Sequence, residues 1–241
     1  MKVFTKTSKW KPARPHWIAV RLLVGSISCL FLLGSRPALA EVDNRLESWT
    51  LVTVQKAFPP VSGLTASLDM QWRWTEDANI FVLRPLVGYL FRTGVAVAAG
   101  YQFNDTADTD GGHKIEHRLV EQASVRSNLS ETVRLSARTR LEQRFGWGDV
   151  VGHRIRFQAR VVWGALSLAP VRLVLSQEYF QNFNTTDWGP KIGFDQDRTF
   201  VGASVQTPWR ARFELGYLGT YANRDPDQLN HGLSLVAITE I

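Results

Sequence analysis

The sequence contains one cysteine, Cys29, which lies among the first 40 residues. If that segment is removed during export, the remaining chain has no thiol, which excludes disulfides and thiolate metal ligands. A long apolar run is also missing, because the run from Leu22 to Gly34 is shorter than the roughly 20 residues that a transmembrane helix needs. No segment has a convincing helical period. These absences leave β-strands as the expected secondary structure.

Acidic residues are absent from residues 1–40, whereas seven basic residues are present there: Lys2, Lys6, Lys9, Lys11, Arg14, Arg21 and Arg36. The apolar run follows the first basic group, and Ala38 and Ala40 then frame an A-x-A cleavage pattern. This order is typical of a secretory signal peptide. We therefore expect cleavage after Ala40 and one mature domain, residues 41–241. The alternative is an uncleaved N-terminal anchor.

The net charge of the chain changes with that cleavage. The whole chain has 28 basic and 22 acidic residues and a net charge of +6. Removing the seven basic leader residues leaves 21 basic residues against 22 acidic ones, a net charge of −1. The high isoelectric point therefore belongs to the targeting segment and does not indicate the basic surface of a nucleic-acid-binding domain. We expect no nucleic-acid partner.

Alternation with a period of two residues dominates the chain after residue 60. In residues 64–75 (LTASLDMQWRWT), apolar and polar side chains alternate at twelve consecutive positions. A strand would place each set on its own face, whereas a helix would scatter both sets around its circumference. Other segments show the same alternation, clearly or weakly: 47–55, 79–92, 94–104, 114–129, 132–146, 152–165, 171–182, 194–207, 210–221 and 230–241.

These segments predict an all-β fold, an antiparallel up-and-down transmembrane β-barrel of about 10–12 strands. From residue 64 onward we count ten strands, an even number that can close in antiparallel fashion. The longer loops, 105–113, 183–193 and 223–230, then leave the same end of the barrel. Segment 47–55 would be an eleventh strand and would break this parity. Either it lies outside the closed sheet or a further strand exists.

The orientation of the two faces distinguishes a soluble sandwich from a membrane barrel. A sandwich packs its apolar faces together and turns its charges to water. A membrane barrel turns the apolar face to lipid, encloses the polar face, and satisfies every backbone hydrogen bond by closure. Long strands and an export signal together favour the barrel. We expect it in the bacterial outer membrane, with outer-membrane lipid and the barrel-assembly machinery as partners.

Short motifs occur in a fixed order along the second half of the chain. They are EHRLVEQ at 116–122, RTRLEQRF at 138–145, RIRF at 154–157, QEYF at 177–180, FDQDR at 194–198, ELGYL at 214–218 and His231. With this ordered set, the chain resembles the bacterial family called domain of unknown function 2490 over about residues 47–241. That family is an uncharacterised group of presumed outer-membrane proteins. The resemblance therefore implies a fold and a location, and no known activity.

Arginine and glutamate residues are concentrated on the predicted inner face. We expect thirteen of them to form a lattice in the lumen: Glu116, Arg118, Arg138, Arg140, Glu142, Arg144, Arg154, Arg156, Arg160, Glu178, Arg198, Arg212 and Glu214. Neighbouring strands bring such side chains within pairing distance, and guanidinium groups bind carboxylates in bidentate geometry. The simpler interpretation is structural, because buried charges need partners. The alternative is a path or site for a small anionic solute, since arginine rings favour anions in pores.

Signals for enzymatic or metal chemistry are weak. The sequence has no GxSxG, HExxH or EF-hand motif. A hydrolase or acyltransferase site would have to use residues from a small set: His113, His117, His153, His231, Ser176 and Ser204. The aspartates of loop 105–113 could offer oxygen ligands to Ca²⁺, although a solvated loop is the simpler interpretation. We expect no catalytic residue, no metal ligand and no cofactor.

The sequence thus predicts an integral outer-membrane barrel that is either structural or a narrow pore for small solutes with an arginine-rich lumen. The alternatives are a lipid-modifying outer-membrane enzyme and a soluble periplasmic β-domain. Several tryptophans lie near predicted strand ends, where they would form an interfacial girdle or pack in the core: Trp72, Trp74, Trp147, Trp163, Trp188 and Trp209.

Overall fold

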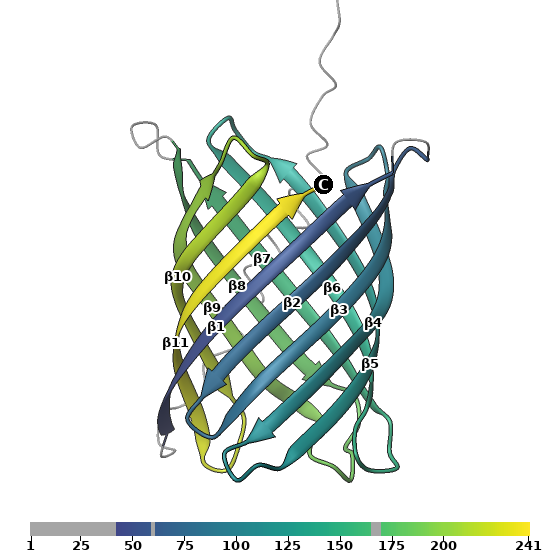
Figure 1. Cartoon of the computed structure of the whole chain (residues 1–241), viewed down its shortest axis with the longest axis vertical. Coiled ribbons are helices and arrows are strands. Elements are labelled where there is room, and N and C mark those ends of the chain that lie inside the picture. Colours follow the sequence, from purple (N-terminus) through teal and green to yellow (C-terminus); the bar gives the residue numbers. More distant parts are fainter. Residues whose placement is uncertain (1–41, 59–60, 165–169) are drawn as a thin grey trace, which may run out of the picture. The chain divides into compact units, whose positions relative to one another are not determined.

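The computed structural model describes residues 42–58, 61–164 and 170–241. The expected leader, including Cys29, lies outside these residues. The described chain is all-β, and its eleven strands form one closed barrel (Figure 1). The strands are β1 (Val42–Ala57), β2 (Leu64–Thr75), β3 (Ala78–Leu90), β4 (Val95–Asp108), β5 (His113–Asn128), β6 (Val133–Phe145), β7 (Gly152–Trp163), β8 (Val171–Asn182), β9 (Gly193–Gln206), β10 (Ala211–Ala222) and β11 (Asp227–Glu240).

The period of two in the sequence becomes the two faces of this sheet. In β2, the alternate residues Ser67, Asp69 and Arg73 line the interior, whereas Trp74 is exposed on the outside. Successive side chains of a strand point to opposite faces, so one strand supplies both surfaces. The expected all-β barrel of 10–12 strands is confirmed.

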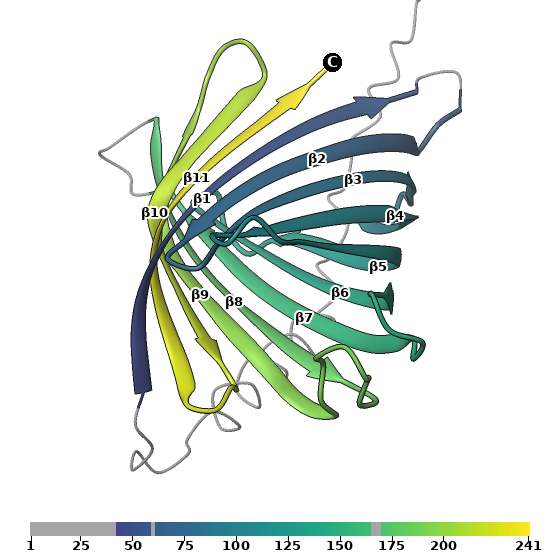
Figure 2. The same cartoon turned by 60° about the horizontal axis from the view of Figure 1, so that its bottom comes forward.

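The closure of the barrel differs from the expected antiparallel pattern. Each strand pairs antiparallel with the next, but β1 pairs with β11 in parallel, from Val42 opposite Asp227 to Gln55 opposite Glu240. In Figures 1 and 2, β1 and β11 run side by side in the same direction. Both explanations offered for segment 47–55 were therefore wrong. The segment lies within the closed sheet, and an odd number of strands closes because one pair is parallel.

The two ends of the barrel carry different connections. At the end where β1 begins, which we call the loop end, the connections include 109–112, 146–151, 183–192 and 223–226. At the other end, which we call the turn end, they include 91–94, 129–132 and 207–210. The three longer predicted loops do leave the same end, but all three are shorter than predicted, by one residue in the case of 183–193. The strands continue to Asp108 and start again at His113, and β11 begins at Asp227.

A small apolar core lies inside the barrel. Val174, Phe200 and Leu218 are buried and pack together, with Trp49 and Val162 against them. The Phe200 ring fits because β9 and β10 each have a glycine beneath it. A Cβ atom on Gly202 would come within 2.6 Å of this ring, and one on Gly216 within 2.8 Å.

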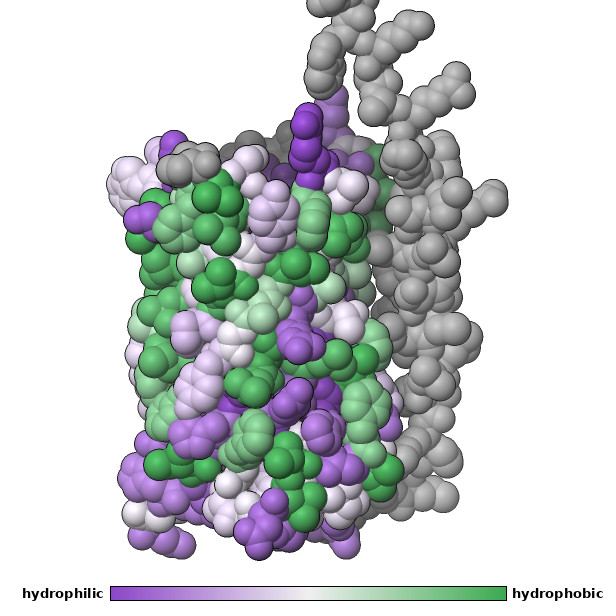
Figure 3. Space-filling model, turned by 90° about the vertical axis from the view of Figure 1, so that its right-hand side faces the viewer, coloured by the Kyte–Doolittle hydropathy of each residue, from purple (hydrophilic) through white to green (hydrophobic). Residues whose placement is uncertain are grey.

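The outer face of the wall is largely apolar. Large apolar side chains are exposed along the strands. Val97 and Leu173 lie toward the turn end, and others lie farther along the strands: Leu119, Leu141, Leu175, Val201, Leu215, Leu233 and Leu235. Exposed aromatic residues occur at both ends, with Trp74 and Phe145 at the loop end and Tyr89, Phe91, Trp163 and Trp209 at the turn end, whereas Tyr101, Phe157 and Tyr217 are exposed within their strands. On the face in Figure 3, apolar side chains spread over the wall and hydrophilic ones gather toward the loop end. The described residues contain no helix long and apolar enough to cross a membrane.

Candidate functional site

A cavity of about 1150 Å³ occupies the lumen. Its lining includes Trp188 and Arg224 from the loop end and Arg134 and Arg172 near the turn end, so it reaches along the barrel. Fifteen arginines and two lysines line it, against six carboxylates. The lumen is therefore strongly cationic, although the expected mature chain as a whole is nearly neutral.

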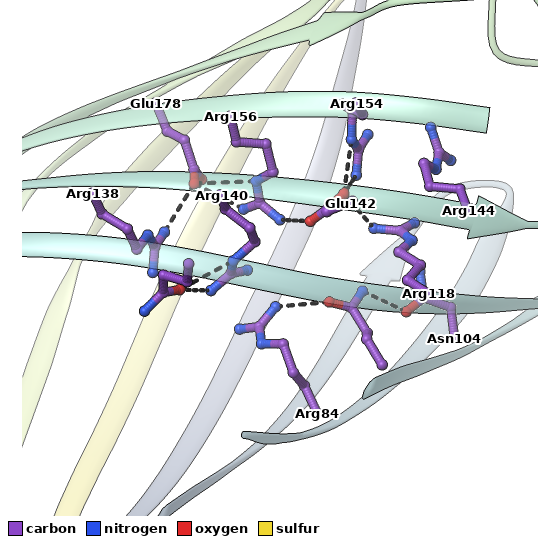
Figure 4. Close-up of polar contacts among 12 residues, drawn as sticks. Arg84, Asn104, Arg118, Arg138, Arg140, Glu142, Arg144, Arg154, Arg156 and Glu178 are labelled. Carbon is purple, nitrogen blue, oxygen red and sulfur yellow. Dashed lines mark hydrogen bonds and ion pairs between the residues drawn. The ribbon is translucent and has the colours of Figure 1, made fainter. Parts of the chain in front are cut away.

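Glu142 of β6 is the centre of the ion-pair network. Its side chain is 1% exposed and accepts hydrogen bonds from Arg154 at 2.6 and 2.9 Å and from Arg156 at 2.8 Å (Figure 4). Arg118 reaches the same carboxylate at 3.5 Å. Two strands thus bring three guanidinium groups to one carboxylate, because β5 and β7 flank β6.

Glu178 and Glu116 extend this network in opposite directions. Glu178 of β8 accepts hydrogen bonds from Arg138 at 2.8 Å and from Arg156 at 2.9 Å. Glu116 of β5 is held by Arg118 at 2.8 Å through two nitrogens, and by Arg144 at 2.6 Å. Arg156 and Arg118 therefore each bridge two carboxylates. We call the set Arg118, Arg138, Arg144, Arg154, Arg156, Glu116, Glu142 and Glu178 the paired wall.

Smaller ion pairs occupy other parts of the lumen. Arg84 donates two hydrogen bonds to Asp69, at 3.0 and 2.6 Å, and a third to Gln102 at 2.9 Å. Nearer the turn end, Glu214 pairs with Arg160 at 2.5 Å and with Arg212 at 3.0 Å. The Arg84–Asp69 pair links the adjacent strands β2 and β3, and the Arg160–Glu214 pair links β7 to β10 across the interior.

A second group of arginines lies on aromatic rings. The guanidinium groups of Arg73 and Arg198 lie over the Trp49 ring, 4.1 and 4.5 Å from its centroid. Arg198 also lies 4.5 Å from the Phe180 ring, which Arg156 covers at 4.4 Å. We call Trp49, Arg73 and Arg198 the stacked wall. Among the described carboxylates, none forms an ion pair with Arg73 or Arg198.

Arg140 is a buried arginine without a carboxylate partner in the part of the chain that the structure describes. It is 2% exposed, and Nε and Nη2 both donate to Gln122, at 3.1 and 2.6 Å. Its Nη1 is buried without a partner. Its direct neighbour on β7 is another cation, Arg156. Burial of a guanidinium beside a like charge is costly unless an anion or a dipole compensates it.

Two loops come together over the cavity at the loop end. Trp188 donates its indole N–H to the Val150 carbonyl at 2.7 Å, and its ring packs against Trp147 and Arg144. Asp187 accepts backbone N–H groups of Asp149 at 2.9 Å and Val150 at 3.2 Å. These hydrogen bonds hold the pKa of Asp187 below its usual range. The loop pair therefore shapes this mouth of the cavity.

The structure places all thirteen expected lattice residues in the interior. Twelve line the cavity, and Glu142 is buried against three of them. Eleven take part in ion pairs with described residues, but Arg140 and Arg198 do not. Although Arg198 lies opposite Glu178 in the register, that carboxylate is taken by Arg138 and Arg156.

Several interior residues were missed by sequence reasoning. Asp69 and Arg73 carried a signal, since they lie on the polar face of the alternating segment 64–75. Trp49 carried none, because β1 had no assigned place in the sheet. Asp195 was hidden by a register irregularity between β8 and β9 at Phe180 and Gln181. It pairs with Arg154 at 3.0 Å and with Arg224 at 3.1 Å.

The histidines and serines considered for catalysis lie on opposite faces. Ser176 and Ser204 line the lumen. His117 lies on the outside and shares a hydrogen bond with Tyr101, and His231 contacts Tyr217 at 2.7 Å and Asn44 at 3.1 Å. His113 pairs with Asp105, and His153 is exposed in the same outward register. No serine hydroxyl reaches a histidine among the described residues.

The acidic loop also differs from a calcium site. Asp105 pairs with His113 at 2.9 Å and Asp108 with Lys114 at 2.7 Å, so both carboxylates are used within the β4–β5 hairpin. Across the described ranges, no group of three or more potential ligands could hold a metal ion.

Residues 46–231 match the family described as protein of unknown function (DUF2490). The chain belongs to this family. It is also 29% identical over 227 residues to an uncharacterized protein of Methylorubrum extorquens, an alignment that covers 89% of this chain and 95% of the relative. The DUF2490 match spans β2 to β10 entirely and the greater part of β1. The paired wall and the stacked wall both lie within it.

Proposed function

We propose that this DUF2490 protein is an integral outer-membrane barrel whose lumen is a narrow pore for small anionic solutes. The observation that carries the proposal is the polarity of the wall. The outside exposes large apolar side chains along its whole circumference, while fifteen arginines line the inside. A protein surrounded by water would leave the apolar surface uncompensated, since exposed apolar patches of that extent mark contact with a membrane or a partner.

Two further features support a membrane environment. The closed sheet leaves no strand edge unpaired, as hydrocarbon requires. The exposed aromatic residues near the strand ends are placed where membrane barrels carry their aromatic girdles. The signal-peptide pattern of residues 1–40 supplies the export route, and the barrel-assembly machinery would insert the chain.

The lumen supports solute passage more than a purely structural role. A barrel of about eight strands is filled by its side chains, whereas eleven strands enclose more space. Here, a cavity of about 1150 Å³ persists between the arginine side chains. Its cationic lining would concentrate anions and repel cations, as arginine rings do in anion-selective pores.

Location is tested by fractionation of the native host. We expect the protein in the outer-membrane fraction, resistant to alkaline carbonate and released by detergent. Release by carbonate would show a soluble or peripheral protein and would contradict the proposal.

Solute passage is tested in planar bilayers under a KCl gradient. We expect a small conductance with a reversal potential that indicates selectivity for chloride. Neutralising Arg138 and Arg140 to glutamine is expected to reduce that selectivity. The matched control is Lys56→Gln, which removes one positive charge from the exposed outer side of β1 and is expected to leave selectivity unchanged. Absence of conductance, with altered lipid A or phospholipid in a deletion strain, would instead favour a lipid-modifying enzyme.

A further inference from the structure

The stacked wall presents guanidinium edges that bind nothing in the described structure. A guanidinium that lies flat on an aromatic ring uses its face, so the N–H groups in its plane stay available for hydrogen bonds. The guanidinium carbons of Arg73 and Arg198 both lie over the Trp49 ring. Their Nε atoms are buried and unpartnered. Both residues border the cavity, and their terminal nitrogens donate to no described acceptor.

No described carboxylate of the lumen forms an ion pair with these two arginines. Glu178 and Glu142 are occupied by the paired wall. Glu47 is buried nearby, but it accepts a hydrogen bond from Thr220 at 3.1 Å and forms no ion pair with a described cation. Two positive charges without an ion-pair partner therefore meet at the Trp49 ring, and Glu47 acts on both only from beyond ion-pair distance. In a cavity with low-dielectric sides their repulsion is weakly screened.

Arg140 adds a further unbalanced charge to the same cavity. It is almost fully buried, borders the lumen, and keeps one nitrogen without a partner. Arg156 lies between these unpaired charges. Arg140 is its neighbour in the sheet, and Arg198 contacts the same Phe180 ring. The two arginines of the stacked wall alone carry about as much positive charge as one divalent anion would balance.

We infer that the stacked wall is a binding site for a small divalent oxyanion of the phosphate class. Guanidinium forks match the spacing of phosphate oxygens and bind them in bidentate fashion. Two unpaired arginines match two negative charges, and the indole of Trp49 fixes both forks without consuming their donors. Chloride is monovalent and offers no pair of oxygens, so it would bind far less strongly. The inference rests on the proposed pore in one respect: the site would select the solute that the pore passes. Phosphate binding itself requires only the folded barrel.

Binding is measured by equilibrium dialysis of the purified, detergent-solubilised barrel with radiolabelled inorganic phosphate at low ionic strength. We expect saturable binding of about one phosphate per chain. Unlabelled sulfate, a dianion of the same shape, is expected to compete, while chloride at equal ionic strength is expected to compete at least tenfold less effectively.

The double variant Arg73→Gln/Arg198→Gln is expected to weaken phosphate binding at least tenfold. Neither arginine is ion-paired with a described residue, so this change breaks no ion pair, although it takes two nearby positive charges away from the buried Glu47. The variant Arg73→Lys/Arg198→Lys keeps both charges and loses the forks, and it is expected to bind several-fold more weakly than the native protein. The matched control is Arg126→Gln/Arg172→Gln, which removes the same charge from exposed positions near the turn end and should retain native affinity.

Three outcomes would overturn the inference: no saturable phosphate binding, equal binding by the native protein and both stacked-wall variants, or an equal loss in the control. The lysine variant keeps the test valid if the glutamine variant fails to fold, which heat-modifiable electrophoretic mobility would reveal. The pore proposal is judged separately by conductance. Anion-selective current without saturable phosphate binding would contradict the phosphate site and support the pore. Phosphate binding without current would support the site and contradict the pore.

Discussion

The paired wall and the stacked wall use the same residue type in different ways. In the paired wall, the guanidinium groups of Arg118 and Arg156 each reach two carboxylates. In the stacked wall, Arg73 and Arg198 lie on Trp49 and reach no described carboxylate. The paired wall lies on the consecutive strands β5 to β8, whereas the stacked wall brings Arg198 of β9 to β1 and β2 across the lumen, and both sets border one cavity. Whether the charge of an arginine is compensated within the protein therefore depends on the residue that it contacts.

This difference separates structure from function in the lumen. A buried carboxylate with three guanidinium partners fixes the strands that carry them, and removal of one partner leaves an unpaired buried charge. A guanidinium held on a ring is oriented by dispersion and electrostatic attraction, and its donors remain available. The paired wall therefore maintains the barrel, and the stacked wall offers hydrogen bonds to a solute.

The largest effect is expected at the centre of the paired wall. Glu142→Gln would leave Arg118, Arg154 and Arg156 with one negative charge fewer in a buried site, at a cost of about 3–5 kcal/mol in the free energy of unfolding. Urea unfolding of the barrel in lipid vesicles, followed by tryptophan fluorescence, measures this cost. Glu131→Gln makes the same chemical change in an exposed turn and is expected to cost almost nothing. Equal stability of the two variants would show that the network is not structural.

The outer face of the barrel differs from both walls because it exposes apolar side chains in place of arginines. Leu215 lies at mid-height on β10 and is 52% exposed. Leu215→Arg would place a charge in hydrocarbon and lower the free energy of unfolding in vesicles by about 2–4 kcal/mol. Val205→Arg, close to the turn end, is expected to cost about 0–1 kcal/mol by the same depth dependence. Equal costs at the two depths would contradict a membrane-spanning wall.

Glu121 is an exception on that outer face and gives a test of opposite sign. It is exposed at mid-height on β5, with Ala99 and Leu141 beside it on the neighbouring strands. In lipid, Glu121→Leu is expected to stabilise the barrel by about 1–2 kcal/mol, since a carboxyl group costs less than a basic group at that depth. The same unfolding assay in vesicles measures it. Destabilisation would indicate that this part of the wall contacts water or a polar partner.

A direct comparison of the two walls uses one substitution in each. Arg73→Gln removes a cation–π contact and leaves no described carboxylate unpaired, so a loss of about 1 kcal/mol is expected. Arg156→Gln removes the shared partner of Glu142 and Glu178 and is expected to cost about 3–5 kcal/mol. Denaturant unfolding of both variants under one condition gives the difference. Equal costs would remove the distinction between the walls.

The smallest effect is expected in the loops, through Asp187. Its folded-state pKa lies below the ordinary aspartate value because it accepts two backbone N–H groups. The carboxylate therefore stabilises the loop pair above the unfolded-state pKa, and this stabilisation is lost as pH falls through the folded-state pKa. Amide exchange at Asp149 and Val150 should accelerate across that interval. Asp187→Asn should accelerate it already at neutral pH, and unchanged exchange would contradict the assignment.

The alternation of residues 64–75 was enough to predict a long strand with two faces. The same rule, applied to Arg138, Arg140 and Glu142, placed them together on one face of β6. These predictions succeeded because side-chain direction in a strand depends only on local geometry. The family was also identified from short motifs that lie on those strands.

Closure and partner choice could not be predicted in this way. The parallel pairing of β1 with β11 depends on which two edges meet after all other strands have paired, which no local pattern encodes. Likewise, Arg198 faces Glu178 in the register but lies on Trp49 and Phe180 instead. A side chain that reaches into the lumen can contact partners from several strands. The sequence therefore predicts which face of the sheet a residue lies on, but not which residue it contacts.

The orientation of the wall is tested most directly by cysteine accessibility in vesicles. Two single-cysteine variants of the mature chain, Leu215→Cys outside and Ser176→Cys inside, are treated with a water-soluble maleimide and with a lipid-soluble one. The account predicts that the cysteine at 176 reacts with the water-soluble reagent and the cysteine at 215 only with the lipid-soluble one. Rapid reaction at 215 with the water-soluble reagent would show that the apolar face meets water, and it would contradict the account.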